Sequence, residues 1–418
     1  MASSNPQPWR VALRCPQCGV PIDLEESSRL FACAYCRVRL FLDPGETPRY
    51  YLVAKGLPAE EPIYAPYWRY QGLFFRLAGS QVEGAAVDAN LLALPEGLFP
   101  PSLGLRPQTQ TLSFVSPKIP GRFLKPAFDF HEAAARLESR FLRVSQALQS
   151  TQPSAFVGET ISLIYAPFLR RGRTLRDLLP SRPAEPGPID IENLDRLESE
   201  AQRDWTPAFL PALCPKCGWD LEGDEKSRVL NCPTCGRLWQ AARGRYQEVE
   251  AAALDGGADG DLYLPFWRIQ PEVDGLSLRT YADLARLANL PRAELAAWQG
   301  EPFHFLVPAF LLPPRLFLRL TRQMTLYRPG ESFESVPPGR VLHPVSLPLS
   351  QAAESLALNL GHLSADKRDL AETLAGVRVR LGRAALLYVP FSPSGPDLVH
   401  AAGRIGVSRV ALLRERNF

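Results

Sequence analysis

The eight cysteines form four C-x-x-C pairs, and their spacing is the feature of this sequence that most directly predicts chemistry. The pairs are Cys15/Cys18, Cys33/Cys36, Cys214/Cys217 and Cys232/Cys235. In each half of the chain, 14 residues separate the first pair from the second. Two C-x-x-C pairs at this separation are typical of a four-cysteine metal site. A disulfide framework would instead scatter its cysteines through a small secreted chain. We therefore expect each set of four thiolates to bind one metal ion.

The metal that this pattern favours is zinc, because tetrahedral sites made of thiolates alone hold zinc or iron. The turns read CPQCG, CAYC, CPKCG and CPTCG, where Pro fixes φ and Gly relieves the turn. We expect two Zn²⁺ ions per chain. Four protein ligands leave no open coordination position, so both ions would be structural. Rubredoxin-type iron, which would imply electron transfer, is the alternative, although its pairs usually lie further apart.

The cysteine segments resemble the zinc-ribbon superfamily in their four-cysteine sites and CPxCG knuckles. With a P-[FY]-W element further along, the chain also resembles bacterial double zinc-ribbon proteins of unknown role. The resemblance covers the cysteine segments and implies a fold but no single function. Zinc ribbons occur in transcription factors, ribosomal proteins, replication proteins and protein-binding adaptors. Some such proteins are labelled replication-helicase-like, but this chain lacks helicase motifs and that function is not carried over.

The second half of the sequence repeats the first in the same order. Each cysteine of the second cluster follows its counterpart by 199 residues. The segment YAPYWRY at 64–70 matches YLPFWRI at 263–269 with the same offset, and LIYAPF at 163–168 matches LLYVPF at 386–391 with an offset of 223. Matches that stay collinear over a whole chain predict a tandem duplication.

The predicted fold class is α+β, in which each copy is a four-cysteine zinc ribbon followed by a small antiparallel sheet with a packed helix. The predicted units are zinc ribbon 1 at 1–42, α+β domain 1 at 43–180, an acidic linker with a short helix at 181–213, zinc ribbon 2 at 214–240 and α+β domain 2 at 241–418. Composition predicts strands at 109–115 and 323–327. Apolar spacing predicts helices that begin near Asp129, after Thr280 and at Ser350, with a further helical segment at 365–376.

The repeated Y-x-P-[YF]-W-R element is the candidate partner-binding site outside the cysteines. Its residues are Trp68, Arg69, Trp267 and Arg268. Trp and Arg are frequent in protein-binding hot spots, and Trp can also stack on a base. The structural alternative is that the Trp side chains fill the core between ribbon and sheet while the Arg side chains extend outward.

Motifs for catalysis are missing from the sequence. It contains no G-x-x-x-x-G-K-[ST], G-x-G-x-x-G, H-E-x-x-H or G-x-S-x-G. Its five histidines are scattered, and every cysteine is assigned to a metal. We therefore expect no catalytic residues, no enzymatic activity and no small-molecule substrate.

Charge and hydropathy favour an intracellular protein that does not bind polyanions by bulk charge. The net charge of +3, from 47 basic and 44 acidic residues, excludes polyanion binding by bulk charge alone. The N-terminus lacks the apolar run of a signal peptide, and prolines and arginines interrupt the most apolar stretch at 303–320. We expect a cytoplasmic adaptor or scaffold within a larger assembly. The alternative is an accessory protein of transcription or replication that binds nucleic acid through the ribbon faces.

Overall fold

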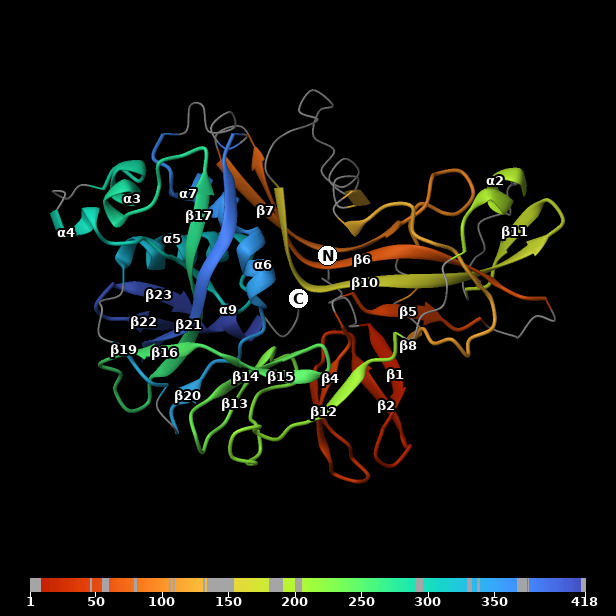
Figure 1. Ribbon diagram of the computed structural model, residues 1–418, viewed down its shortest axis with the longest axis horizontal. Helices are drawn as coiled ribbons and strands as arrows, with labels where there is room; N and C mark the ends of the chain where they lie inside the picture. The colour runs from red at the N-terminus through yellow and green to blue at the C-terminus, as the bar shows by residue number, and fades with distance from the viewer. Residues whose placement is uncertain are drawn as a thin grey trace.

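Two large mixed sheets, one from each half of the chain, form the frame of the computed structural model (Figure 1). The structure describes residues 9–414 except 46, 55–59, 79–80, 105–106, 108–109, 131, 134–153, 180–190, 200–204, 291–295, 329–332, 337–338, 367–373 and 375. Both strands and helices are present, as expected for an α+β protein. The predicted helical segment at 365–376 and most of the helix after Asp129 lie outside the described residues.

The first sheet has nine strands, and its central strands run in the order β5-β10-β6-β7. Its strands are β1 (Arg10–Arg14), β2 (Pro21–Glu25), β5 (Arg49–Leu52), β6 (Ile63–Ala78), β7 (Gln81–Leu92), β8 (Thr111–Phe114), β9 (Arg122–Phe123), β10 (Ser154–Arg171) and β11 (Thr174–Asp177). The hairpin β1–β2 belongs to this sheet through a parallel pairing of β1 with β8. The first cysteine pair is therefore attached directly to the sheet edge.

The second sheet has eight strands, with the central order β16-β21-β17-β18. Its strands are β16 (Ala251–Leu254), β17 (Leu262–Asp274), β18 (Phe305–Pro308), β19 (Phe333–Glu334), β20 (Val341–Leu342), β21 (Arg378–Ser394), β22 (Asp397–His400) and β23 (Ile405–Ser408). Both sheets contain parallel pairs, β5 with β10 and β9 with β6 in the first, β16 with β21 and β20 with β17 in the second. A small antiparallel sheet was predicted for each copy. The long central pairs are antiparallel, but the sheets are larger than predicted and mixed, because crossover connections return short strands alongside β6, β10, β17 and β21.

The central strand pairs of the two sheets have matching registers. Pro66 of β6 lies opposite Tyr165 of β10, and Pro265 of β17 lies opposite Tyr388 of β21. The pairings of β7 with β6 and of β18 with β17 match in the same way. These residues belong to the segments that repeat in the sequence, so equivalent sequence positions occupy equivalent places in the two sheets.

Most described helices belong to the second half. They are α2 (Ile191–Arg196), α3 (Tyr281–Leu287), α4 (Ala296–Gln299), α5 (Pro314–Tyr327), α6 (Leu349–Glu354), α7 (Leu356–Leu363) and α9 (Arg409–Arg414). The helix predicted after Thr280 is confirmed as α3, and Thr280 caps it with Asp283 in a reciprocal capping box. The helix predicted at Ser350 is present as α6 and α7, but its N-cap is Pro348.

The strand predicted at 323–327 was wrong, because these residues form the last turns of α5. Polar and apolar residues alternate within 323–327, as in a strand. Over the longer segment, however, Phe317, Leu320 and Met324 are buried at the helical spacing of i, i+3 and i+7. Phe317 stacks on Phe75 of β6 at a centroid distance of 5.7 Å. The C-terminal part of β6 and the N-terminal part of β10 thus belong to the hydrophobic core of the second half. Helix α6 packs against β10 and helix α7 against β6 (Figure 1).

Candidate metal centres

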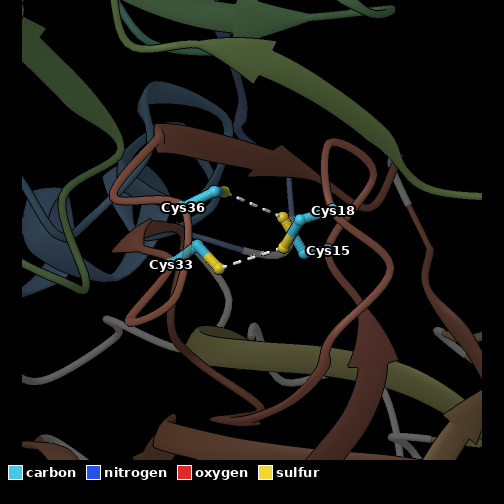
Figure 2. Close-up of side chains that lie close together, drawn as sticks. All are labelled: Cys15, Cys18, Cys33 and Cys36. Atoms are coloured by element: carbon cyan, nitrogen blue, oxygen red, sulfur yellow. Dashed lines mark hydrogen bonds between the residues drawn. The ribbon is translucent and has the colours of Figure 1, made fainter.

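The first set of four cysteines lies on two tight turns at the ends of β1 and β3 (Leu30–Ala32) (Figure 2). In the first turn, the Gly19 N–H donates to the Cys15 carbonyl at 2.8 Å, and Gly19 has a φ of 74°. In the second turn, which lacks a glycine, Arg37 takes that place with a φ of 60° and donates to the Cys33 carbonyl at 2.8 Å. Each turn directs its two thiols toward the same point.

The second set repeats this arrangement around Cys214 and Cys232. The Gly218 N–H donates to the Cys214 carbonyl at 2.8 Å and the Gly236 N–H to the Cys232 carbonyl at 2.9 Å. Both glycines have positive φ, 76° and 68°. A side chain is strained in this conformation, which explains why the knuckles carry glycine after the second cysteine. The second turn leads into β14 (Leu238–Ala242), which pairs with β13 (Val229–Asn231) and β15 (Arg245–Val249).

The sulfur positions fit a tetrahedral metal. Within each set all four Sγ atoms lie within 4.8 Å of one another. The closest Sγ–Sγ distances are 3.8 Å (Cys15–Cys36), 3.7 Å (Cys18–Cys33), 3.7 Å (Cys214–Cys235) and 3.4 Å (Cys217–Cys232). Zn–S bonds of about 2.3 Å require S–S edges of about 3.8 Å, whereas a disulfide needs about 2.05 Å. Among the described residues these are the groups of potential ligands that converge in this way, and the residues fit a bound Zn²⁺ at both places.

The electrostatics of the first site favour a cation among the thiols. Backbone N–H groups of Cys36 and Tyr35 donate to the Cys33 sulfur and, against the cost of desolvation, lower its pKa to about 6. The Val20 backbone also favours the Cys18 thiolate, but desolvation and the neighbouring thiols outweigh it and raise the pKa of Cys18 to about 12. Without a cation, ionisation is therefore favoured at Cys33 and opposed at Cys18. A bound divalent cation removes this conflict, since a coordinating thiol is deprotonated outright.

The second site also contains one thiol with a lowered pKa and one with a strongly raised pKa, but the lowered one is the first cysteine of this set and not the third. Desolvation opposes ionisation of Cys214, but hydrogen bonds from the backbone of Cys217 and Lys216 outweigh it and lower the pKa to about 7. Its neighbour Cys217 receives a backbone hydrogen bond from Trp219, yet desolvation and the surrounding thiols raise its pKa to about 12. The two sites thus share one geometry, whereas the cysteine that ionises most readily differs between them.

The two metal centres belong to one packed unit. Strand β12 (Ala208–Pro211), which directly precedes Cys214, pairs with β4 (Arg39–Asp43), which follows Cys36. Leu30 and Phe41, next to the first set of cysteines, join Leu230 and Trp239, next to the second set, in one buried cluster. The Glu225 carbonyl accepts the N–H groups of Arg29 at 2.6 Å and Leu30 at 3.1 Å.

The two tryptophans of the repeated element are buried. Trp68 and Trp267 have exposed fractions of 8% and 2%. The indole Nε1–H of Trp68 donates to the Phe128 carbonyl at 3.0 Å, and that of Trp267 to the Leu347 carbonyl at 2.8 Å. Each indole therefore connects its strand to the chain segment that contains Phe128 or Leu347. Neither ring is exposed enough to stack on a base of a nucleic acid.

The two arginines of this element differ from each other. Arg69 does not extend outward but is fully buried, with its guanidinium 4.3 Å from the Trp9 ring centroid. It forms ion pairs with Asp88 at 2.5 Å and with Glu26 at 3.6 Å. Arg268 is only partly buried, and its guanidinium lies 5.4 Å from the centroid of the Phe333 ring.

Two exposed aromatic residues were missed by the sequence analysis. Tyr35, inside the CAYC turn, is 78% exposed, and Trp219, directly after CPKCG, is 59% exposed. Their positions in the sequence could have predicted this exposure. A side chain inside or directly after such a short turn has little protein to pack against. Each metal centre therefore presents one aromatic ring to its surroundings.

Within the part of the chain that the structure describes, no helix has the length and apolar character needed to span a membrane. Comparisons with protein-family models, with curated proteins and with solved structures find no match to this chain.

Proposed function

We propose that this protein is a non-enzymatic adaptor that binds two structural Zn²⁺ ions and holds a protein partner within a larger assembly. The observation that carries the proposal is the exposure of Tyr35 and Trp219 on the two metal-binding turns. Aromatic anchors on a rigid support lose little entropy when they are buried in a partner, and Tyr and Trp are enriched in hot spots. Closed four-thiolate sites leave no position for a substrate, which favours support over catalysis.

The variant Y35A/W219A tests this proposal. Truncating two hot-spot aromatics is expected to weaken partner binding by about 2 kcal/mol or more, or at least thirtyfold. Proteins cross-linked to the wild-type chain in its own cells would be identified by mass spectrometry, and their affinities for both variants measured. Val341→Ala, at an equally exposed apolar position on β20, serves as the control. Equal affinities for wild type and Y35A/W219A would contradict the adaptor proposal.

The finer features of the proposal have separate support. Zinc is favoured by the sulfur geometry, and a reducing cytoplasm is favoured because eight thiols must stay unoxidised to bind it. A bacterial double zinc-ribbon protein is what the sequence resemblance implies. The matching registers of β6/β10 and β17/β21 support an origin of the chain by tandem duplication.

Nucleic-acid binding is the second candidate, and a specific cleft favours it. A hollow of about 650 Å³ lies between the ribbons and the sheets and is lined by Arg29, Arg228 and Arg243. Asp43 also lines it, but its carboxylate accepts the N–H groups of Gly45 at 3.2 Å and Gly244 at 2.9 Å. If nucleic acid binds here, its affinity should fall steeply with salt and should drop in R243Q. Binding that is insensitive to both would remove this candidate.

A further inference from the structure

Arg69 and Arg268 occupy corresponding positions in the two sheets but have different surroundings. Arg69 lies opposite Asn90 of β7 and Ser162 of β10. Arg268 lies opposite Leu306 of β18 and Ala385 of β21. The hydroxyl of Ser162 donates to Glu26 at 2.6 Å and so helps to hold this acid beside Arg69. The methyl group of Ala385 cannot do this.

Neither of the two acids that pair with Arg69 has a counterpart in an ion pair with Arg268. Asp88 lies two residues before Asn90, and the residue two before Leu306 is His304. The counterpart of Glu26, counted from the cysteines, is Glu225, which is exposed. Among the described residues, no carboxylate forms an ion pair with Arg268, although the charges of Glu250 and Glu301 act on its guanidinium from a longer distance. The second half thus keeps the cation and has replaced the side chains that neutralise it in the first half.

A cavity of about 300 Å³ opens at Arg268. Its polar lining includes His304, Glu301, Arg328 and Thr325, and its apolar lining includes Leu306 and Phe333. Glu301 and Arg328 form an ion pair with each other. Burial, together with the charge of Arg268, lowers the pKa of His304 to about 4, so this imidazole is neutral near pH 7. The charge of Glu301 also acts on Arg268, but its ion pair is with Arg328, so Arg268 is the cation of this lining that has no ion-pair partner.

We propose that this cavity binds a small organic carboxylate, whose carboxylate group takes on Arg268 the place that Asp88 takes on Arg69. A guanidinium binds a carboxylate through two parallel N–H···O bonds, which gives affinity and orientation together. The ring of Phe333 and the side chain of Leu306 form the apolar wall for the body of the ligand. The volume lies at the lower end of the range of small-molecule sites. This site is independent of the adaptor proposal and departs from the expectation that the chain has no small-molecule ligand.

Two variants of the full-length protein with its metal bound test the site. Acetate, butyrate and benzoate, with benzamide as an uncharged analogue of benzoate, would be titrated and followed by ligand-observed NMR. Arg268→Gln removes the cation. His304→Asp places a side-chain carboxylate where the first half has Asp88, so this carboxylate should compete with the ligand. We expect at least one of the three acids to bind wild type, and each variant to weaken its binding at least tenfold.

The control is Arg286→Gln, which removes an exposed arginine of α3 that pairs with Asp283. It should bind the acids as wild type does, and benzamide should bind at least tenfold more weakly than benzoate. Circular dichroism and metal content would identify a variant that fails to fold. If one of Arg268→Gln and His304→Asp does not fold, the binding measured for the other tests the proposal. Failure of all three acids to bind wild type, or unchanged binding by a folded R268Q or H304D protein, overturns the proposal. Partner binding by Y35A/W219A is measured separately, so the two proposals can fail independently.

Discussion

Replacement of Cys214 by serine is expected to reduce the metal content from two ions per chain to one and to unfold the second ribbon. Cys214 provides the thiolate whose pKa is lowered most in its site, and it is almost completely buried. Structural zinc contributes about 10–16 kcal/mol of binding free energy in comparable sites, more than a ribbon of this size obtains from its core. Three remaining thiolates cannot close the tetrahedron. Elemental analysis gives the metal content, and limited proteolysis locates the unfolded segment.

Thr234→Ser is the matched control for this variant, because Thr234 is an exposed non-ligand residue inside the CPTCG turn. It should retain two ions. We also expect damage to spread from C214S into the first ribbon, since Leu30 and Phe41 lose their partners Leu230 and Trp239 in the shared cluster. Two ions bound to a folded C214S protein would contradict the structural role of the second site. Visible thiolate-to-iron absorption in the wild type would contradict zinc.

Arg69→Met is expected to destabilise the fold by about 3–5 kcal/mol, because it removes one partner of a buried ion pair and leaves the others uncompensated. Arg69 connects the end of the β2 hairpin, through Glu26, with Asp88 of β7 and with the ring of Trp9. Urea denaturation measures the loss. The control on the same strand is Arg76→Met. Its partner Glu83 is exposed to solvent, so this ion pair should be worth about 1 kcal/mol or less. Equal losses for the two variants would contradict the role of Arg69.

The pH dependence of Arg69→Met provides a second readout. Burial raises the pKa of Glu26 above its usual value of 4.5, although Arg69 and Ser162 act in the opposite direction. A raised pKa in the folded state means that the contribution of Glu26 to stability is fully present below pH 4.5 and is lost as the pH rises through the folded-state pKa. Without Arg69 this pKa rises further, so the variant should lose more stability at neutral than at acidic pH. Adding Glu26→Gln should abolish this slope.

The sequence predicted the convergence of the two sets of cysteines well but the sheets only in part. The difference lies in how far apart along the chain the interacting residues are. The cysteines converge through turns of four or five residues, so spacing alone identifies the ligands. The strand at 323–327 failed because a window of five residues cannot distinguish alternation from the helical spacing that Phe317 and Leu320 make evident. The parallel pairing of β5 with β10 joins residues more than 100 positions apart, and no local pattern encodes it.

The contrast between Arg69 and Arg268 was also beyond the sequence analysis. Both lie in the same W-R motif, and their difference depends on residues of other strands. Asp88 and His304 become comparable only when the registers of β7 and β18 are known. Glu26 meets Arg69 from a different hairpin, 43 residues earlier in the chain. The sequence motif therefore marks two equivalent positions, and the pairing of strands determines the surroundings of each.

The pairing of β12 with β4 sets an order for synthesis of the chain. Residues 39–43 leave the ribosome long before residues 208–211, which complete their sheet. Until then, the outer edge of β4 has unpaired N–H and C=O groups that can accept a strand from another molecule. During translation, this edge of β4 therefore stays unpaired while about 165 further residues are synthesised. Such a delay is a general consequence of pairing between strands that are far apart in the sequence. Fragments that end before residue 208 should associate with one another through this edge, whereas the complete chain supplies its own strand.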